Sequence, residues 1–475
     1  MSKKLILNLV SAFLGLLSVS AAHAQIITLT SFDGSNGAEP LAGLTVSGNG
    51  NTLYGTTYEG GANDAGTVFS LPVTGGALTT LTSFGEPGGV FPEGGLTLSG
   101  STLYGTTVNG QAENYGSVFS LPVTGGAYSP VGVFLGSNGN YPASDLTLIG
   151  STLYGTTGVG GAHNYGTVFS VPVTGVEQSV TTLVSFNGFN EAYSNGSLTL
   201  SGDGMTLYGT SSGGEAGYGT IFSEPVAGGA PTDRGIFTGT DGTDPLGGMI
   251  LSGHILYGVA GEGGTDNEGT VFALNLQTQI LTALASFTGV NGAYPVPGLV
   301  LEGNTLYGAT FGGGADDDGT LYSLNLNNDV VTTLASFNGS NGTEPEAGPI
   351  LDGITLYGTT DRGGADGDGT VYAYDFEAAP EPSTWSMLLV GLGLLASVRR
   401  SCAELCYLDT LDPQHGLCNG PILAYSTKEA CFLLGGIHPR TLQRATRRGL
   451  IKPIRAFRTL YWTRTELERF LKETI

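Results

Sequence analysis

The tripeptide Leu-Tyr-Gly recurs seven times along the chain, at spacings of 49 to 54 residues, with its tyrosines at Tyr54, Tyr104, Tyr154, Tyr208, Tyr257, Tyr307 and Tyr357. A fixed period of about 50 residues indicates a repeat architecture, because each repeat is one supersecondary unit that stacks on its neighbours. Within each unit, runs rich in Thr, Val, Phe and Tyr are separated by Ser-Gly, Thr-Gly-Gly and Asn-Gly breaks, which predict strands and hairpins. In the second unit we expect strands at 96–99, 102–107 and 117–123 and a fourth that ends at Phe134.

Seven four-stranded units predict an all-β, seven-bladed β-propeller over residues 25–377. The ends of the repeat region support ring closure. A lone strand at 27–32 opens the region, and the last unit stops after its third strand at 370–376. One orphan strand at each end completes a seventh blade if the two pair. An open β-solenoid is the alternative architecture, but it gains nothing from this offset.

The repeat also resembles a known family. The segments LTLSGSTLYGTT (96–107) and GTVFSLPVTGG (66–76) are similar to the GloVer tandem repeat of exported bacterial proteins, and the similarity extends over about residues 26–376. The resemblance implies anchoring at the cell surface and no established enzymatic activity.

The N-terminus has the pattern of a secretory signal peptide over residues 1–24. Lys3 and Lys4 precede an apolar run at 5–19, and Ala22-His23-Ala24 supplies a small-residue cleavage site. We therefore expect the repeat region to be exported, with cleavage after Ala24.

A second targeting pattern lies at 378–400. Pro380, Glu381 and Pro382 precede an apolar stretch at 385–398, which ends at Arg399 and Arg400. This order resembles the PEP-CTERM sorting signal. The resemblance implies an exosortase-type processing enzyme as partner and release to the cell surface or matrix. The apolar stretch is shorter than the ~20 residues of an ordinary span, and the arginines would hold its end on the cytoplasmic side. It predicts membrane association through 385–398 before processing.

The composition changes after Arg400. All four cysteines and most basic residues lie beyond it, whereas Arg234 and Arg362 are the only cations between 25 and 398. Residues 401–424 show no clear pattern and are expected to be an unstructured linker. Cys402, Cys406 and Cys418, with His415, could ligate zinc or remain unpaired thiols, and their spacing is not that of CxxC pairs.

Residues 425–475 predict a small helical domain. A capping box begins at Ser426, Pro439 suits the first turn of a second helix, and Arg440, Arg444 and Arg447 form one basic stripe. The segment resembles the excisionase/MerR-like winged helix-turn-helix family. That resemblance implies DNA contacts from the residues of the second helix and the wing: Arg440, Thr441, Gln443, Arg444, Arg447, Arg455 and Arg458. A solvated basic helix without a DNA-binding role is the alternative.

An exported propeller and a DNA reader belong to different compartments. The join directly after Arg400, where family sorting signals end, favours a fusion or read-through. The competing hypothesis is a membrane-tethered regulator with an external sensor and a cytoplasmic DNA-binding domain.

Catalytic patterns are scarce in the repeat region. His163 and His254 are its only histidines between residues 25 and 398, no cysteine occurs there, and no phosphate-binding loop appears. Serine or cysteine nucleophiles therefore have few bases, so we expect no catalytic residues, no metal ligands and a non-enzymatic protein. An extracellular carbohydrate-active enzyme stays open as an alternative, because paired carboxylates can cleave sugars and carboxylates are plentiful.

Propeller topology places the acidic loops together. Connections from the fourth strand to the next blade and from the second strand to the third emerge on one face, and they carry most acids, including Asp64, Asp266, Glu268, Asp316, Asp317, Asp318, Asp366 and Asp368. Such a face would attract a basic partner or cations, and extracellular polysaccharide is a further candidate. We expect no cofactor, with Ca²⁺ as a candidate ion, whereas the simpler role of these acids is solubility.

Two sets of aromatic side chains leave alternatives open. The Leu-Tyr-Gly tyrosines are expected in the core rather than in a binding ladder, because they lie within strands. One loop position holds an aromatic residue in four units and an acid in the others: Phe91, Tyr141, Tyr193 and Tyr294, then Glu39, Asp244 and Glu344. These loop residues suit sugar stacking, partner binding or packing of the turn.

The tail generates a first prediction. A peptide of residues 420–475 should bind duplex DNA with an affinity that falls as salt rises, because its arginines would displace counterions. Fluorescence anisotropy at several salt concentrations measures this. Unchanged binding by the Arg444→Ala, Arg447→Ala double variant would show that this stripe is not the contact surface.

Overall fold

The computed structural model describes residues 25–376, apart from 87, 111–113, 175–178, 189–193, 195 and 214–216, together with the backbone of three short strands between 424 and 463. The chain divides into two compact units, Met1–Ala378 and Ala379–Ile475. The domain boundaries expected from the sequence stay predictions.

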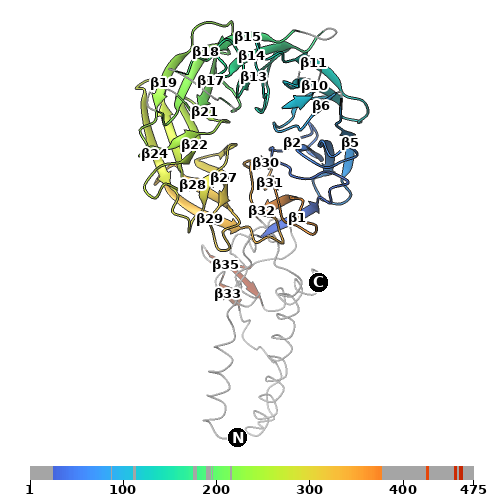
Figure 1. The fold of residues 1–475 in the computed structure, drawn as a ribbon. Coiled ribbons are helices and arrows are strands. Elements are labelled where there is room, and N and C mark those ends of the chain that lie inside the picture. The colour runs from blue at the N-terminus through green and yellow to red at the C-terminus, as the bar shows by residue number, and fades with distance from the viewer. Residues whose placement is uncertain are drawn as a thin grey trace, which may run out of the picture. The chain divides into compact units, whose positions relative to one another are not determined.

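In the described part of the first unit, seven antiparallel sheets form a ring (Figure 1). In blades 1 to 6 the main strands pair in chain order, so each repeat supplies consecutive strands of one blade, as the 50-residue period predicts. Blades 1 to 3 consist of β2 (Thr45–Val46), β3 (Thr52–Thr57), β4 (Thr67–Pro72), β5 (Thr79–Ser83); β7 (Thr97–Ser99), β8 (Thr102–Thr107), β10 (Ser117–Pro122), β11 (Ser129–Val133); and β12 (Thr147–Ile149), β13 (Thr152–Thr157), β14 (Thr167–Pro172), β15 (Thr181–Ser185). Blades 4 to 6 consist of β16 (Thr199–Leu200), β17 (Thr206–Ser211), β18 (Thr220–Pro225), β19 (Thr232–Ile236); β21 (Ile250–Ser252), β22 (Ile255–Glu262), β23 (Thr270–Asn275), β24 (Ile280–Ser286); and β26 (Val300–Glu302), β27 (Thr305–Gly312), β28 (Thr320–Asn325), β29 (Val330–Ser336).

Blade 7 closes the ring with strands from both ends of the repeat region. β30 (Ile350–Asp352), β31 (Thr355–Thr360) and β32 (Thr370–Asp375) come from the last repeat, and β1 (Ile26–Ser31) is the outermost strand. β1 pairs antiparallel with β32, from Ile26 opposite Tyr374 to Ser31 opposite Thr370. The expected pairing of the two orphan strands is confirmed.

Aromatic side chains form the contact between every pair of neighbouring blades. The phenylalanine that follows each outer strand meets the aromatic ring of the third strand in the next blade edge to face, with ring centroids 4.9 to 5.3 Å apart. The seven pairs are Phe32–Phe69, Phe84–Phe119, Phe134–Phe169, Phe186–Phe222, Phe237–Phe272, Phe287–Tyr322 and Phe337–Tyr372. Edge-to-face rings contribute about 0.5–1.5 kcal/mol beyond their area burial, so each contact holds one blade to the next.

The glycine of Leu-Tyr-Gly makes room for these rings. Gly55 lies opposite Phe69 in the β3–β4 ladder, and a Cβ added to it would come within 2.5 Å of that ring. The same glycine–aromatic pairing recurs at Gly358, whose added Cβ would meet the hydroxyl of Tyr372 at 2.4 Å. A side chain at this position would therefore displace the aromatic contact.

Four of the seven Leu-Tyr-Gly tyrosines are buried in the core, and Tyr208, Tyr257 and Tyr307 are partly buried against it. Tyr54, Tyr104, Tyr154 and Tyr357 are each less than a tenth exposed, and Tyr54 packs against residues of the following blade such as Leu103. The expectation of core packing is confirmed for the four buried tyrosines.

Three short pairings lie outside the expected strand pattern. β6 (Gly89–Val90) pairs with β9 (Asn109–Gly110), and β20 (Thr243–Pro245) and β25 (Ala293–Pro295) pair with extended second strands. They arise because the loop entering each blade runs alongside the loop that leaves its second strand. Backbone hydrogen bonds thus fix the loops of one face.

In the second unit, β33 (Ala424–Ser426), β35 (Thr459–Thr463) and β34 (Ile454–Ala456) form a three-stranded sheet in that order. β34 and β35 form a hairpin where a wing was expected, whereas the expected helices lie outside the described residues. Among the residues that the structure describes, no helix is long and apolar enough to span a membrane.

Blade 4 contains a glutamate in the core. Glu224 in β18 is fully buried, neither carboxyl oxygen has a hydrogen-bond partner, and it occupies the position of Leu71 and Leu121 in blades 1 and 2. Burial raises the pKa of Glu224 to about 7, and the nearby N–H of Gly229, outside hydrogen-bonding geometry, opposes this rise in part. The side chain is therefore neutral in the folded protein under mildly acidic conditions.

Ring closure predicts the effect of a terminal deletion. Removing residues 25–33 leaves the edge of β32 unpaired and removes Phe32 from its seam, so the variant should lose stability and aggregate. Thermal unfolding and light scattering compare it with the full chain. A deletion variant that stays monomeric and equally stable would contradict a closed ring.

Glu224 predicts a pH-dependent stability effect. Glu224→Leu should raise the free energy of unfolding by about 1–3 kcal/mol, because an unpaired buried polar group is replaced by the apolar residue of other blades. The unfolded carboxyl ionises near 4.5 and the folded one near 7, so the wild-type chain loses stability as pH rises through this window. Chemical denaturation at pH 5 and pH 8 should show the larger gain at pH 8. Glu302→Leu is the exposed control, and an equal gain at both pH values would refute the explanation.

Candidate functional site

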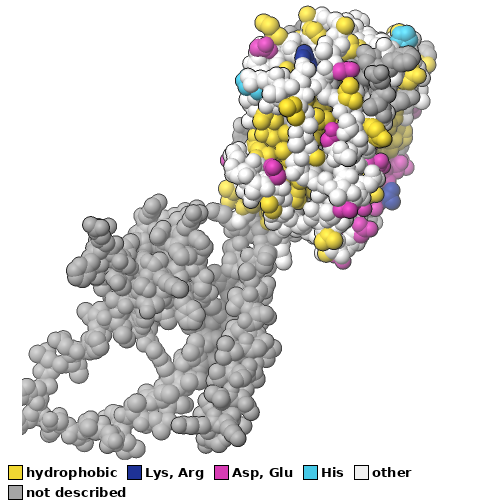
Figure 2. All heavy atoms as spheres, turned by 90° about the vertical axis from the view of Figure 1, so that its left-hand side faces the viewer, with side chains coloured by type: hydrophobic (Ala, Val, Ile, Leu, Met, Phe, Trp, Pro, Cys, Tyr) yellow, Lys and Arg dark blue, Asp and Glu magenta, His cyan; other side chains and the backbone are white. Residues whose placement is uncertain are grey.

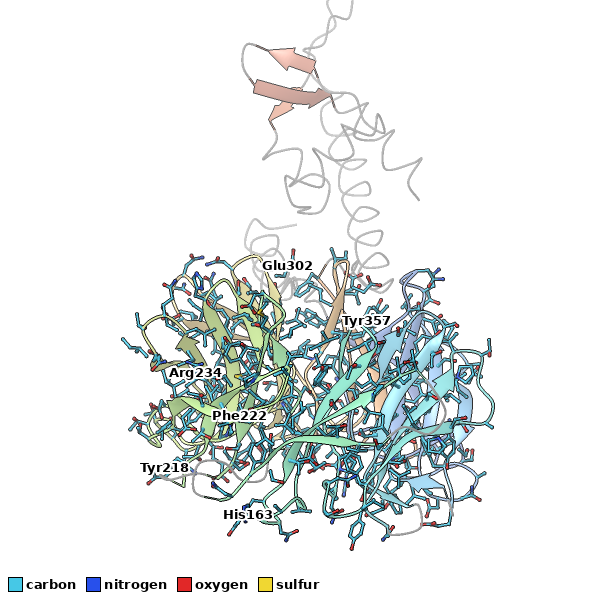
Figure 3. All side chains as sticks on the ribbon, turned by 90° about the horizontal axis from the view of Figure 1, so that it is seen from above. His163, Tyr218, Phe222, Arg234, Glu302 and Tyr357 are labelled. Atoms are coloured by element: carbon cyan, nitrogen blue, oxygen red, sulfur yellow. The ribbon has the colours of Figure 1, made fainter. Side chains whose placement is uncertain are left out.

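The two faces of the propeller are unlike. The loops entering each blade and the loops between second and third strands lie on one face, where Figure 3 shows His163 and Tyr218, while Glu302 lies at the opposite face. The turns on the opposite face, where Glu302 lies, are short, as between β7 and β8. We call the face with the longer loops the acidic face. Figure 2 shows acidic side chains gathered toward one rim, with a basic side chain among them.

Most of the acids expected on this face are exposed loop residues, and some shape the loops themselves. Asp64 and Asp317 have positive φ angles, and their Oδ1 atoms accept hydrogen bonds from the N–H groups of Gly60 and Gly313. Asn164 makes the same contact with Gly160, so the charge is not needed for the turn. Within the described ranges, no group of three or more His, Cys, Asp or Glu side chains is placed to hold a metal ion.

The variable loop position has an unusual backbone. Its six described members, Glu39, Phe91, Tyr141, Asp244, Tyr294 and Glu344, all have φ between 52° and 61° and all precede proline. A left-handed conformation at a non-glycine residue costs about 1–3 kcal/mol, and hydrogen bonds from neighbouring loops hold it. In blade 1 the N–H of Tyr58 donates to the Glu39 carbonyl at 2.9 Å. Tyr193 lies outside the described residues.

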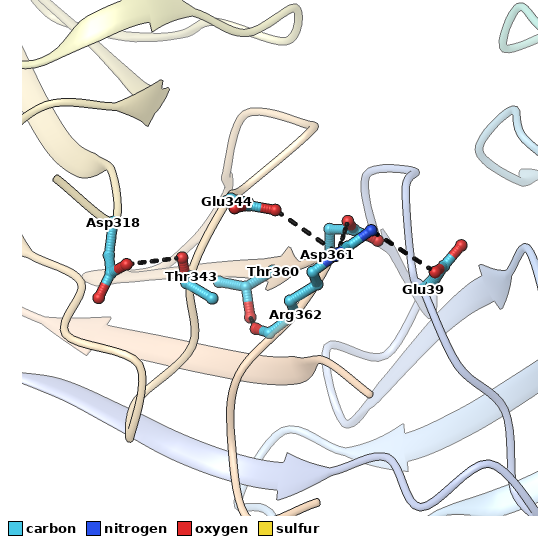
Figure 4. A network of polar contacts seen from close by, with 7 residues as sticks. All are labelled: Glu39, Asp318, Thr343, Glu344, Thr360, Asp361 and Arg362. Atoms are coloured by element: carbon cyan, nitrogen blue, oxygen red, sulfur yellow. Dashed lines mark hydrogen bonds and ion pairs between the residues drawn. The ribbon is translucent and has the colours of Figure 1, made fainter. Parts of the chain in front are cut away.

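Arg362 joins three acids from three loops at the closure of the ring (Figure 4). Its Nε lies 3.2 Å from Asp361 Oδ2 and 3.6 Å from Glu344 Oε2, and its Nη2 lies 4.0 Å from Glu39 Oε1. Glu39 belongs to the loop after β1 and Glu344 to the loop before β30, so residues about 300 positions apart meet here.

Further acids surround this centre. We define the acidic cluster as Glu39, Glu59, Glu93, Glu344, Glu346 and Asp361, which come from the loops of blades 7, 1 and 2. Burial is the main cause that raises the pKa of Glu346, to about 7, and the charges of Asp361, Glu344 and Glu93 add to it. Burial likewise raises the pKa of Asp361, which Arg362 partly offsets.

Aromatic side chains flank the cluster. The rings of Tyr58 and Phe91 stack with centroids 5.1 Å apart, and the Tyr141 hydroxyl donates to Glu93 Oε2 at 2.6 Å. That hydrogen bond lowers the pKa of Glu93, against a larger rise from burial. Two members of the variable loop position are thus engaged in packing and in a hydrogen bond.

Buried hydroxyl pairs hold the loops that carry the cluster. Thr57 and Thr67 lie with Oγ1 atoms 2.8 Å apart, and Thr57 donates to the Glu59 carbonyl at 2.9 Å. Thr360 and Thr370 repeat this pair at 2.8 Å, and Thr360 donates to the Arg362 carbonyl at 3.0 Å. The positions of Glu59 and Arg362 therefore depend on side chains at the ends of buried strands.

The other sites expected from the sequence are not tested by the described residues. Arg455 lies on β34, whereas Arg440, Thr441, Gln443, Arg444, Arg447 and Arg458, and the sorting residues Pro380, Glu381, Pro382, Arg399 and Arg400, lie outside them. His163 and His254 are exposed on a second-to-third-strand loop and on a first-to-second-strand turn, so they belong to opposite faces.

Sequence reasoning did not single out Glu93, Glu346 or Asp361. A signal was present, because each departs from what the repeat has elsewhere. Glu93 and Glu346 replace residues such as Leu41 and Val296, and Asp361 stands where other units have Tyr, Val, Gly, Ser or Phe.

The comparison with protein families covers most of the chain. The model of the Gloeobacter/Verrucomicrobia repeat matches residues 15–212 and 176–372. The chain belongs to the Gloeobacter/Verrucomicrobia repeat family. Directly after this repeat region, residues 378–401 match the PEP-CTERM protein-sorting motif, which marks a protein for export to the cell surface. The expected resemblances to the tandem-repeat family and to the PEP-CTERM signal are confirmed, whereas the expected resemblance of the tail to the excisionase/MerR-like family is not shown. No curated protein matches the chain.

Several solved structures are similar to this Gloeobacter/Verrucomicrobia repeat protein. An oligogalacturonate lyase from Vibrio parahaemolyticus is 11% identical, with a TM-score of 0.51, over 76% of this chain and 96% of that one. TolB from Acinetobacter baumannii is 14% identical with a TM-score of 0.39, over 63% of this chain and 65% of that one. A puromycin-hydrolyzing peptidase from Mycobacterium tuberculosis is 12% identical with a TM-score of 0.34, over 71% and 61%. At 11% identity the likeness to the oligogalacturonate lyase shows the fold alone.

Proposed function

We propose that this repeat protein acts at the cell surface or in the extracellular matrix as a non-enzymatic binding protein whose acidic face contacts the ligand. The observation that carries the proposal is the direct succession of a closed propeller and a sorting motif at 378–401. An exosortase-type enzyme would process the motif and leave the propeller outside the cell.

The composition of the acidic face supports binding rather than turnover. Its histidine, His163, is exposed on blade 3, whereas the acidic cluster belongs to blades 7, 1 and 2. Among the described residues, the carboxylates of the cluster contact a guanidinium and a tyrosine hydroxyl, without an imidazole or thiol to activate a nucleophile.

A carbohydrate-active enzyme is the second candidate, and one observation favours it. The pKa of Glu346, raised to about 7, suits a general acid at neutral pH. Against this, cleavage of an acidic sugar chain such as oligogalacturonate would bring a polyanion to an acidic surface. Incubation with neutral and acidic oligosaccharides tests whether the protein cleaves them. Cleavage that the Glu346→Gln variant abolishes would favour the enzyme over the binding protein.

The sorting motif predicts where the protein accumulates. Replacing Pro380, Glu381 and Pro382 by alanine should prevent processing, so that an unprocessed, membrane-associated form accumulates and surface protein falls at least tenfold. Cell fractionation and surface labelling in a host with an exosortase measure both. Glu377→Ala, one position before the motif, is the matched control for the lost charge. Normal surface display of the triple variant would contradict the sorting role.

A further inference from the structure

The chain enters and leaves the propeller on the face opposite the acidic face. β32 begins at Thr370, after a loop of the acidic face, and runs to Asp375 at the opposite face. β1 is antiparallel to it and begins at that opposite face, with Ile26 opposite Tyr374. The sorting motif at 378–401 follows β32 directly. The chain therefore continues into the motif from blade 7, on the face away from the acidic loops.

The residue that follows β32 is held in place. The N–H of Phe376 donates to the Ile354 carbonyl at 3.3 Å. The ring of Phe376 lies 5.1 Å from the ring of Tyr307 in blade 6 and 5.4 Å from the ring of Tyr374, measured between centroids. The point where the chain leaves the propeller is thus fixed against two blades.

The sorting motif is very close to this fixed point. Pro380 is four residues after Phe376 in the sequence, and four fully extended residues span at most about 14 Å. Even a small protein domain is about 30 Å across. An enzyme that holds Pro380, Glu381 and Pro382 must therefore lie against the end of blade 7 from which the chain leaves.

This end of blade 7 carries exposed apolar side chains. Ile27 on β1 and Ile354 in the turn between β30 and β31 are each 49% exposed, and Phe376 is 36% exposed. We call these three residues the exit patch. Apolar side chains that stay exposed at one place in a repeat protein are a candidate contact surface for a partner.

The exit patch departs from the repeat. Ile27 pairs with Ala373, and the residues at the same register position in blades 1 to 6 are all Thr or Ser: Thr79, Ser129, Thr181, Thr232, Thr282 and Thr332. The residues whose carbonyls accept the same hydrogen bond as that of Ile354 are Asn51, Ser101, Ser151, Met205, His254 and Asn304. The donors of that bond, equivalent to Phe376, are Val73, Val123, Val173, Val226, Leu276 and Leu326. Blade 7 therefore has larger or less polar residues at the place where the chain continues into the motif.

Carboxylates lie beside the exit patch. Asp352 pairs with Thr355, which pairs in turn with Asp375, so these residues form a row across β30, β31 and β32. An apolar centre with a polar rim is the usual composition of a protein–protein interface. A membrane that contains anionic lipids would instead repel the two carboxylates. The surface therefore suits a protein partner better than a lipid surface.

We propose that the exit patch is a docking surface for the enzyme that processes the sorting motif. Recognition then extends from Pro380, Glu381 and Pro382 onto the folded propeller. The inference rests on the sorting role proposed above and adds to it a second contact, made by the end of blade 7.

Substitutions that restore the residues of other blades test this surface. The triple variant Ile27→Thr, Ile354→Ser, Phe376→Val should slow processing at least about fivefold in a host with the enzyme, because a few apolar or aromatic anchors carry most of the energy of an interface. Met205→Ser, at the position of Ile354 in blade 4, is the matched control and should leave the rate within about twofold. Pulse–chase labelling measures the rate as the loss of the unprocessed form. Ile354→Glu, on an exposed turn, repeats the test if thermal unfolding shows that the triple variant is destabilised.

A linker insertion separates docking from folding. About 20 Gly and Ser residues placed after Phe376 let the enzyme hold the motif at a distance from blade 7. In that background the triple variant should be processed within about twofold of its parent, because the patch is no longer held next to the enzyme. A patch effect that persists with the insertion would show that the substitutions act through folding or export, which would overturn the proposal.

Two other outcomes also count against the docking surface. Equal processing rates for the wild type and the triple variant would remove it, and weaker membrane association of the triple variant in a host without the enzyme would reassign the patch to lipid contact. The alanine variant of Pro380, Glu381 and Pro382 keeps the two proposals apart. Its normal display would contradict the sorting role, whereas its failure beside normal processing of the triple variant would contradict the docking surface alone.

Discussion

At every seam between blades, the ring that follows one outer strand meets the aromatic ring of the next blade edge to face, and the facing glycine leaves it room. This arrangement explains the strict return of Leu-Tyr-Gly and of a phenylalanine after each outer strand, because a larger residue at the glycine or a smaller one at the phenylalanine would open the seam. Blade 7 follows the same rule at both of its seams, although the ring it contributes to one seam, Phe32, and the ring it contributes to the other, Tyr372, come from opposite ends of the repeat region. The seven seams are therefore chemically alike, and none of them is a preferred place for the ring to open.

Because the contacts between blades are alike, the loop sequences can differ from one blade to the next. Backbone hydrogen bonds and buried threonine pairs hold the loop framework in blades with different loop sequences, so charge can change at one blade without altering the fold. The acidic cluster illustrates this freedom. It combines departures from the repeat in blades 7, 1 and 2, where Asp361, Glu346 and Glu93 replace less polar residues.

The sequence was sufficient to predict the strands of blade 2 to within a residue or two, the closing pair of β1 and β32, and the burial of Tyr54, Tyr104, Tyr154 and Tyr357. These features follow from local alternation and from repetition. The cluster could not be predicted in the same way, because contact between Glu39 and Arg362 depends on how the ring closes over more than 300 residues. The left-handed backbone of the pre-proline position was also missed, since proline normally drives its predecessor to an extended conformation and only the neighbouring loops override this. The helices and sorting residues of the second unit lie outside the described residues, so those predictions stay open.

The position of β1 has a consequence for the order in which the protein can be completed. A chain that emerges from a secretion channel N-terminus first presents β1 at the outset, yet the partner of β1 is β32, among the last strands of the propeller to emerge. During the interval β1 has no partner strand, although Phe69, the ring that Phe32 meets, belongs to the first complete blade to emerge. The ring thus becomes a single cooperative body when translocation of the repeats is finished, and the sorting motif at 378–401 follows immediately. Completion of the fold and arrival of the anchoring signal are therefore coupled by chain order alone.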